Sequence, residues 1–160
     1  MSDVNRLLDA AAEAVGRVRY CWLVTNAGGA CRTRPMGRLP RDAGDDPWLL
    51  RFLTNGQSGK AGDMRRSAGV SVIFDDDPHE AYVALAGKAT LIEDKAEIRG
   101  RWLPAYETYF PEGPERSGAV FVTVDVGRIE LWIRGVTPEP FGLKTTVIER
   151  DGERCWRYRA

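Results

Sequence analysis

The stretch FLTNGQSGKAGDM, residues 52–64, changes half way along from a strand pattern to a helical one. The apolar run ends at Leu53, small and polar residues follow as far as Lys60, and a helical pattern begins at Ala61. Ser58 is placed to cap that helix. A strand followed by a Gly/Ser/Lys turn and a helix is typical of a phosphate-binding site, because the free N–H groups of the helix start favour an anion.

The kind of phosphate site is restricted by what stands around the Gly-Lys pair. A nucleotide-binding P-loop needs G-x-x-x-x-G-K-[ST], but Thr54 occupies the first Gly position and Ala61 the position of the Mg²⁺-binding hydroxyl. Nucleoside triphosphate hydrolysis is therefore not expected. Two interpretations remain open for the stretch: anion binding without Mg²⁺ through Ser58 and Lys60, or an ordinary helix cap followed by a solvated lysine. Composition alone favours the second.

The rest of the chain reads as many short strands with a few helices. Apolar residues at helical spacing predict an N-terminal helix over residues 1–18, and residues 94–110 read as a helix in two pieces broken at Pro104. Gly87, in the middle of a long strand pattern, indicates a bend or bulge. This pattern predicts a small antiparallel barrel rather than a parallel sheet. The expected strands cover residues 20–26 and 30–36 as a hairpin, 48–54, 70–74, 81–92, 119–126 and 128–134 as adjacent paired strands, and two short runs within 145–159 about an Asp151-Gly152 turn.

Length, charge and cysteine content place limits on the class of protein. A chain of 160 residues is expected to form one domain over residues 1–160, with residues 135–160 as a C-terminal extension. Lys plus Arg and Asp plus Glu both number 23, which gives no bias toward nucleic acid or anionic membranes. No apolar stretch approaches the ~20 residues of a membrane helix. Three widely spaced cysteines without a C-x-x-C pair favour the cytoplasm, and a single His makes a metal site unexpected.

Six motifs follow one another in an order that matches a known family. They are RTRPM at residues 32–36, the opening stretch at 52–64, GVSVIF at 69–74, GKATLI at 87–92, RWLPAYETYF at 101–110 and IELWI at 129–133. The series resembles the FMN-binding split-barrel superfamily of the pyridoxamine 5′-phosphate oxidases, especially its short general-stress-protein 26 branch. The opening stretch fits the F-x-T-N-x-x-S-x-K-A pattern of that family closely. The resemblance covers roughly residues 17–134.

The resemblance implies a mainly β protein, a small antiparallel split β-barrel with an N-terminal helix and short flanking helices, which holds FMN. It also implies a homodimer with the flavin site at the subunit interface. Its site residues fall into three groups by their implied role. Arg32, Ser58 and Lys60 would bind the 5′-phosphate; Thr33, Arg34, Pro35 and Met36 would run under the isoalloxazine edge; Leu53, Thr54 and Tyr82 would line the ring. For Arg34, contact with the cofactor and exposure to solvent are equally expected.

Two departures from the family pattern limit what the resemblance implies about function. Gly37 stands where the oxidases have a lysine, and the C-terminal Arg- and His-bearing motif that holds pyridoxal phosphate has no counterpart. Oxidation of vitamin B6 is therefore not expected. The first hypothesis is an FMN-dependent oxidoreductase, linked to NAD(P)H or stress, of unknown substrate. The alternatives are an FMN-binding stress protein with little turnover, or a split barrel that uses a deazaflavin or haem. The single His weakens haem, and the S-x-K pattern favours FMN. No catalytic residue is identified.

Several conspicuous side chains are expected to be structural. Trp132 could cap a flavin face, but a strand Trp is more often part of the core. Cys21 and Cys31 lie on apolar strands and are expected to be small core residues. The aromatic residues between Trp102 and Phe110 are expected in the core or in a dimer contact. His79, beside a proline in a polar turn, is expected to be exposed.

Overall fold

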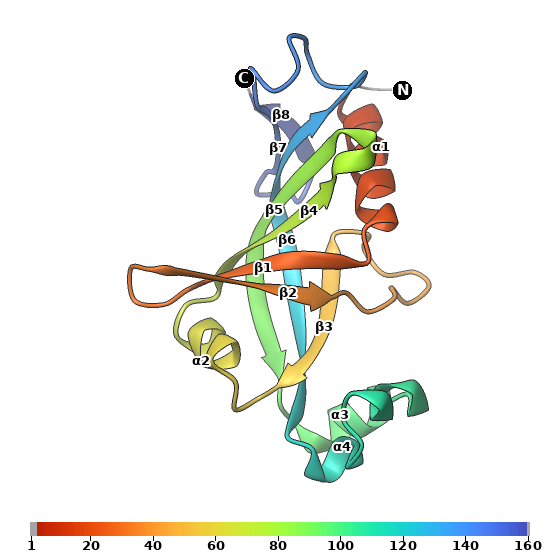
Figure 1. Ribbon diagram of the computed structural model, residues 1–160, viewed down its shortest axis with the longest axis vertical. Helices are drawn as coiled ribbons and strands as arrows, with labels where there is room; N and C mark the ends of the chain where they lie inside the picture. The colour runs from red at the N-terminus through yellow and green to blue at the C-terminus, as the bar shows by residue number, and fades with distance from the viewer. Residues whose placement is uncertain (1–2, 160) are drawn as a thin grey trace.

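The computed structural model describes residues 3–159, in which helices surround one antiparallel sheet of eight strands (Figure 1). The strands are β1 (Tyr20–Asn26), β2 (Cys31–Gly37), β3 (Leu49–Asn55), β4 (Gly69–Asp76), β5 (Ala81–Ile92), β6 (Ala119–Ile133), β7 (Thr146–Arg150) and β8 (Trp156–Arg159). The helices are α1 (Asp3–Arg17), α2 (Gly59–Arg66), α3 (Lys95–Arg101) and α4 (Gly113–Arg116), with the 3₁₀ turns η1 (Asp77–His79) and η2 (Pro104–Thr108). The expectation of a mainly β protein with short flanking helices is confirmed.

The order of the strands leaves the barrel split between β2 and β3. The sheet runs β2-β1-β4-β5-β6-β7-β8, and β3 pairs with β6 alone. Among the described residues, strands β2 and β3 therefore each have one backbone edge without a sheet partner. Just past β2, the Leu39 N–H donates to the Arg51 carbonyl of β3 at 2.8 Å, which ties the two strands together at one end of the split.

Strand β6 corrects the expectation of two adjacent strands at residues 119–126 and 128–134. It is a single strand whose first half pairs with β3 and whose second half pairs with β7, while β5 runs beside both halves. Gly127 suggests a turn in the sequence, but in the register Gly87 faces Val126 and Ala86 faces Arg128. Gly127 is thus the extra residue of a β-bulge, which bends the strand without ending it. The bend expected at Gly87 is confirmed at the same place.

The core lies inside the curved sheet and beneath α1. Strand residues alternate between buried and exposed positions, as a sheet with one covered face requires. The apolar stripe of α1, including Leu7, Ala11 and Val15, packs on this core. The helix expected over residues 1–18 is therefore present, and positions 1 and 2 lie outside the described residues. A smaller cluster of Ile98, Val120 and Phe121 holds α3 against the start of β6.

The segment expected as a C-terminal extension continues the main sheet, because β7 pairs with β6 and β8 with β7. The predicted hairpin is present, but its loop is longer than the Asp151-Gly152 pair. The Asp151 carboxylate accepts N–H bonds from Glu153 at 3.0 Å and Cys155 at 2.9 Å. Trp156 of β8 then makes an edge contact with Trp48, with ring centroids 6.0 Å apart. Position 160 lies outside the described residues.

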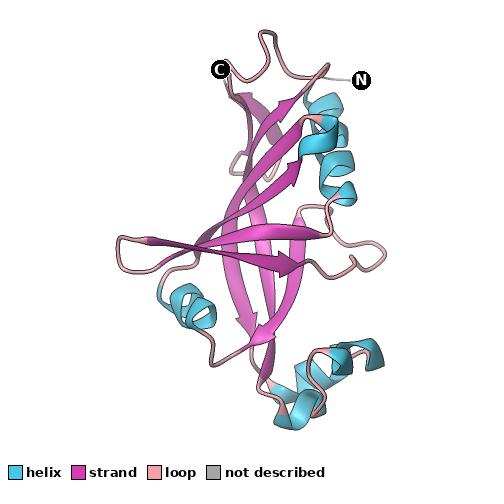
Figure 2. Cartoon of the chain, in the orientation of Figure 1, coloured by secondary structure: helices cyan, strands magenta, loops and turns pink. Residues whose placement is uncertain are grey.

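The helices gather at three places around the sheet. Figure 2 shows α1 along its upper part, α2 below the β1–β2 hairpin, and α3 with α4 at the lower end. Within residues 3–159, none of these helices has the length and apolar character needed to cross a bilayer.

Candidate functional site

The opening stretch folds as its sequence predicts, with β3 ending at Asn55 and Ser58 capping α2. The Ser58 hydroxyl accepts the N–H of Ala61 at 3.4 Å, and the Asn55 side chain accepts the N–H of Gln57 at 2.8 Å. Gly56 fits close against β6, since a Cβ at this position would meet a methyl group of Val120 at 2.9 Å. The turn is therefore fixed on the barrel, and the start of α2 has a defined place.

A buried carboxylate that the sequence analysis did not single out organises the site. The Asp63 side chain of α2 is 0% exposed, and its Oδ2 accepts a hydrogen bond from the Thr25 hydroxyl of β1 at 2.9 Å. Arg66 donates to the other oxygen at 2.9 Å. The guanidinium groups of Arg32 and Arg34, both on β2, lie 3.8 and 3.7 Å from the carboxylate. Asp63 therefore joins α2 to the β1–β2 hairpin.

The sequence does contain a signal for this pair. Thr25 follows Cys21 and Leu23 at alternate positions of β1, all three of which point into the core. Asp63 lies between the buried Ala61 and Met64 of α2. A polar residue at a buried position of each element indicates a partner, because buried polar groups are normally hydrogen-bonded.

The cluster carries more positive than negative charge. The hydrogen bond from Thr25, and then the charges of Arg32 and Arg66, hold the pKa of Asp63 below its usual range. Burial, and then the charge of Arg34, lower the pKa of the Lys60 ammonium. Among the described residues Lys60 has no hydrogen-bond or ion-pair partner. One carboxylate thus faces three arginines, and Lys60 lies close enough to Arg34 to feel its charge, which leaves cationic groups available to an anion.

The residues expected to hold a phosphate converge at the start of α2. A Cβ on Gly59 would lie 3.5 Å from Nη1 of Arg32, so this guanidinium reaches across from β2 to the helix start. Ser58 and Lys60 flank Gly59 in the chain. The side chain of Arg32 is 58% exposed, so its donors remain accessible. A planar guanidinium, an ammonium, a hydroxyl and free helix N–H groups form a donor set that suits a phosphate dianion.

The remaining candidates on β2 divide between its two faces. Arg34 and Met36 share the face of Arg32, whereas Thr33 and Pro35 lie opposite, where their register partners on β1 are Val24 and Trp22. Arg34 is neither free nor directed to solvent, since it donates to the Thr25 hydroxyl at 2.8 Å and is 20% exposed. Residues 32–36 all lie on β2, whose outer backbone edge has no partner strand among the described residues.

The ring-lining candidates are spread more widely. Leu53 is half-buried and packs against the small cluster at the start of β6, while Thr54 is buried with its side chain inside the barrel. Tyr82 lies about five residue steps along the sheet from Thr25, which corresponds to about 16 Å. Its hydroxyl bonds to Asp77 and its ring lies 6.3 Å from that of Phe141. The bond to Asp77, and then burial, raise the pKa of Tyr82 to about 12.

The structural expectations for the other side chains are met only in part. Cys21 is buried, but Cys31 is exposed at the hairpin turn, so the expectation for Cys31 was wrong. Trp132 is half-buried opposite Tyr82 and does not belong to the fully buried core. His79 is exposed, as expected, and its ring nitrogen lies 2.9 Å from Asp76. Within residues 3–159 no group of His, Cys, Asp and Glu side chains is arranged to hold a metal ion.

The aromatic run after α3 packs mainly within itself. Trp102 makes edge contacts with Tyr106 and Phe110 at centroid distances of 5.6 and 6.4 Å, and Tyr106 contacts Phe121 at 5.9 Å. Tyr109, in contrast, is 70% exposed. The run is therefore partly core, and Tyr109 lies on the surface.

Comparison with known proteins agrees with this architecture. A protein from Clostridium acetobutylicum related to general stress protein 26 superposes with a TM-score of 0.71 at 18% identity, covering 93% of this chain and 96% of that one. A pyridoxamine 5′-phosphate oxidase-related, FMN-binding protein from Nostoc punctiforme gives a TM-score of 0.68 at 16% identity, covering 98% and 95%. PhzG from Burkholderia lata, solved with tetrahydrophenazine-1-carboxylic acid, gives 0.67 at 18% identity, covering 97% and 88%.

At these identities the superpositions show the shared split-barrel fold. No curated protein matches the sequence. A family match is found in the sequence itself, over residues 8–146, to the family described as pyridoxamine 5′-phosphate oxidase like. The match includes both the cationic cluster and the split between β2 and β3. The chain belongs to the pyridoxamine 5′-phosphate oxidase-like family.

Proposed function

We propose that this protein binds FMN with its 5′-phosphate at the start of α2 and acts as an FMN-dependent oxidoreductase on a small molecule. The observation that carries the proposal is the convergence of Arg32, Ser58 and Lys60, with Lys60 lacking an acceptor among the described residues. Family membership and the description of the Nostoc punctiforme neighbour as FMN-binding support the same cofactor.

Each residue at the start of α2 has a separate task toward the phosphate. Arg32 presents its planar donor fork, and Lys60 adds a mobile charge. Ser58 can donate its hydroxyl proton to a phosphate oxygen while its own oxygen continues to accept the Ala61 N–H. Asp63 does not face the anion; it holds Arg32 and Arg34 in place and prevents excessive repulsion among the cations.

Beyond the phosphate, the two one-sided strands would receive the ring. The unpaired edges of β2 and β3 offer backbone N–H and C=O groups of the kind that the pyrimidine edge of a flavin needs. The half-buried side chains of Met36 and Leu53 supply apolar surface near these edges. Bound FMN would supply hydride or electron transfer, so the protein's task is to place the ring and its substrate. Because FMN would supply the redox chemistry and the protein only the positioning, we propose an oxidoreductase.

The proposal predicts a strong preference for the phosphorylated flavin. The apoprotein should bind FMN at least about tenfold more tightly than riboflavin, because riboflavin lacks the group that neutralises the cluster. Fluorescence titration of both flavins measures this ratio. Equal affinities would refute the phosphate site. Anaerobic addition of NADH or NADPH should then bleach the flavin absorption. If the FMN preference is present but neither nicotinamide bleaches the flavin, the electron-transfer part of the proposal is contradicted, and a binding role is favoured.

We further propose that the protein is a homodimer in which the outer face of β1 and β4 contacts the second chain. Tyr20, Trp22 and Ile73 on this face are 57, 45 and 36% exposed, and Trp22 and Ile73 are direct partners across the two strands. Pro35 of β2 lies beside Trp22 on the other side and extends the row. A contiguous apolar surface of this kind is typical of a protein interface.

A charge on this apolar face should separate the two chains. Sedimentation at micromolar concentration should give twice the mass of one chain for the unmodified protein, and Trp22→Glu should shift it to a single chain. Leu143→Glu is the control for an added surface charge, since Leu143 is 72% exposed on the loop that follows β6. A monomeric unmodified protein, or a dimer that Trp22→Glu leaves intact, would contradict this interface.

A further inference from the structure

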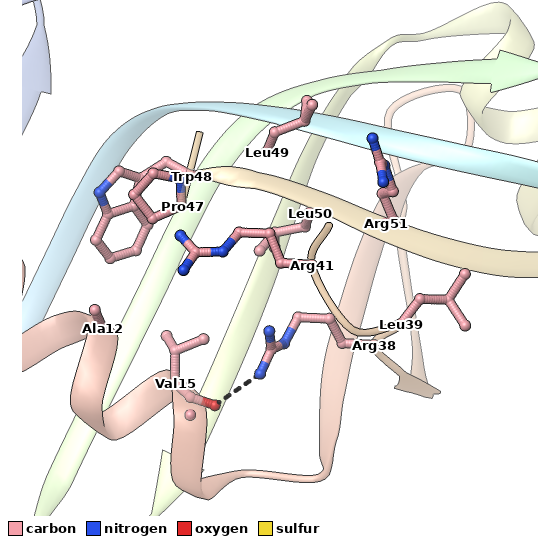
Figure 3. A pocket seen from close by; sticks show the side chains of 11 residues that line it. Ala12, Val15, Arg38, Leu39, Arg41, Pro47, Trp48, Leu49, Leu50 and Arg51 are labelled. Atoms are coloured by element: carbon pink, nitrogen blue, oxygen red, sulfur yellow. Dashed lines mark hydrogen bonds between the residues drawn. The ribbon is translucent and has the colours of Figure 1, made fainter. Parts of the chain in front are cut away.

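A second basic site lies between α1 and the start of β3. It is a pocket of about 330 Å³, whose floor is formed by the buried side chains of Val15, Trp48 and Leu50. Arg38 and Arg41, from the segment after β2, form the polar side. Figure 3 shows both arginine side chains directed into the space between α1 and Trp48. The pocket is therefore apolar on one side and cationic on the other.

Within residues 3–159, no carboxylate pairs with the guanidinium groups of Arg38 and Arg41. Among the described residues that line it, none is Asp or Glu. Arg51 also borders it, but Arg51 pairs with Asp42 and, at 3.0 Å, with Asp45. Arg41 makes no ion pair or hydrogen bond within residues 3–159. Burial, and then the charge of Arg41, lower the pKa of Arg38, as expected for a guanidinium without a counterion.

A role for Arg38 as a helix cap accounts for only part of this arrangement. Its Nη2 lies 3.4 Å from the carbonyl oxygen of Val15 in the last turn of α1, so it contributes a weak cap. Its Nε is buried and has no hydrogen-bond partner. The C-terminus of a helix carries roughly half a negative charge, which cannot balance two guanidinium groups. An acceptor is therefore still required, and Arg41 has no part in the cap.

We propose that this pocket binds a small organic acid, with its carboxylate or phosphate on Arg38 and Arg41 and its apolar part against Val15, Trp48 and Leu50. The volume lies at the lower end of the range of about 300–1,000 Å³ for small-molecule sites, which limits the ligand to a compact one. Planar guanidinium groups favour carboxylate and phosphate over other anions because both accept two parallel hydrogen bonds.

The pocket is separate from the flavin site and does not rest on it. Arg38 follows the end of β2, four residues beyond Arg34, and four residues of extended chain span about 13 Å. Met36, between them, packs against the core and closes the direct route. A ligand at Arg38 and Arg41 therefore does not share the donors of Arg32 and Lys60.

Four probes test the two halves of the pocket. In the Arg32→Gln/Lys60→Ala background, which removes two cations from the cluster at α2, isothermal titration should show that benzoate and phenyl phosphate bind, and that the neutral benzamide and inorganic phosphate bind at least tenfold more weakly. Arg41→Gln should weaken both organic acids by tenfold or more, since it removes a cation without touching the α1 cap. Arg116→Gln, an exposed arginine remote in sequence, should change nothing. In ¹⁵N spectra, benzoate should shift the indole N–H signal of Trp48 and leave that of Trp132 in place.

The reciprocal variants separate the two basic sites. Arg32→Gln should leave benzoate binding unchanged, and added FMN should not compete with benzoate. The proposal is overturned if neither organic acid binds, if Arg41→Gln binds them as the unmodified protein does, or if inorganic phosphate binds as tightly as phenyl phosphate. Loss of benzoate binding in Arg32→Gln would likewise overturn it, because the acid would then occupy the cluster at α2. The results with the organic acids can be interpreted whether or not the protein binds FMN.

Discussion

The double variant Arg32→Gln/Lys60→Ala is expected to weaken FMN binding by roughly two to four orders of magnitude and riboflavin binding by less than about twofold. In the proposed site each cation would make a charge-assisted hydrogen bond to the phosphate worth about 1.5–3 kcal/mol. Two such bonds give about 3–6 kcal/mol, and each 1.4 kcal/mol corresponds to a factor of about ten. Riboflavin keeps the ring contacts and lacks the phosphate, so the same variant should hardly affect it.

Matched variants distinguish this effect from a general loss of structure. Lys88→Ala removes a lysine that also follows a glycine, but Lys88 is exposed on β5 and should leave both affinities unchanged. Ser58→Ala should weaken FMN less than Lys60→Ala alone, because a neutral hydroxyl contributes only about 1 kcal/mol. Titration of both flavins into each apoprotein measures the ratios. An equal loss for FMN and riboflavin would place the cluster away from the phosphate.

The strand, turn and helix of residues 52–64 could be predicted from sequence because their parts are neighbours in the chain. Ser58 caps a helix that starts at the next residue, so propensity and capping act over a few positions. Asp63 could not be found in this way. Its function depends on Thr25, which lies 38 positions earlier and reaches it only when β1 and α2 have packed. Single-sequence patterns indicate that a buried acid needs a partner, but they do not identify it.

The incorrect prediction of a strand end between residues 126 and 128 has a similar cause. Gly127 weakens a strand pattern in the sequence, and a turn is the simplest local explanation. The structure places it in a bulge because β5 offers Ala86 and Gly87 on the opposite side, with the register shifted between them. The partition of β2 into two faces also depends on pairing. The sequence order of Arg32 to Met36 is continuous, but strand alternation divides the side chains once β1 fixes which face is covered.

Gly87→Ala is expected to destabilise the protein by about 3 kcal/mol, the upper part of the usual cost of forcing extra atoms into a packed site. A Cβ on Gly87 would lie 2.5 Å from the carbonyl oxygen of Asp125, 2.9 Å from its carbonyl carbon and 3.0 Å from a methyl group of Val124. Two of these atoms belong to the backbone of β6, which cannot move without disturbing its pairing with β3. For a chain of this size, the melting temperature should fall by roughly 6–12 °C.

Two further glycines of this sheet, Gly127 and Gly69, provide controls with the opposite expectation. Gly127 is the extra residue of the same bulge, yet it has neither a left-handed backbone conformation nor any atom within 4 Å of its added Cβ, so Gly127→Ala should change stability by less than about 0.5 kcal/mol. Gly69, at the start of β4, is equally open. Urea unfolding of the three variants gives the comparison directly. If Gly127→Ala costs as much as Gly87→Ala, the bulge depends on the flexibility of both glycines. If Gly87→Ala alone lowers the stability, the close approach of β5 to β6 determines how sharply the barrel bends.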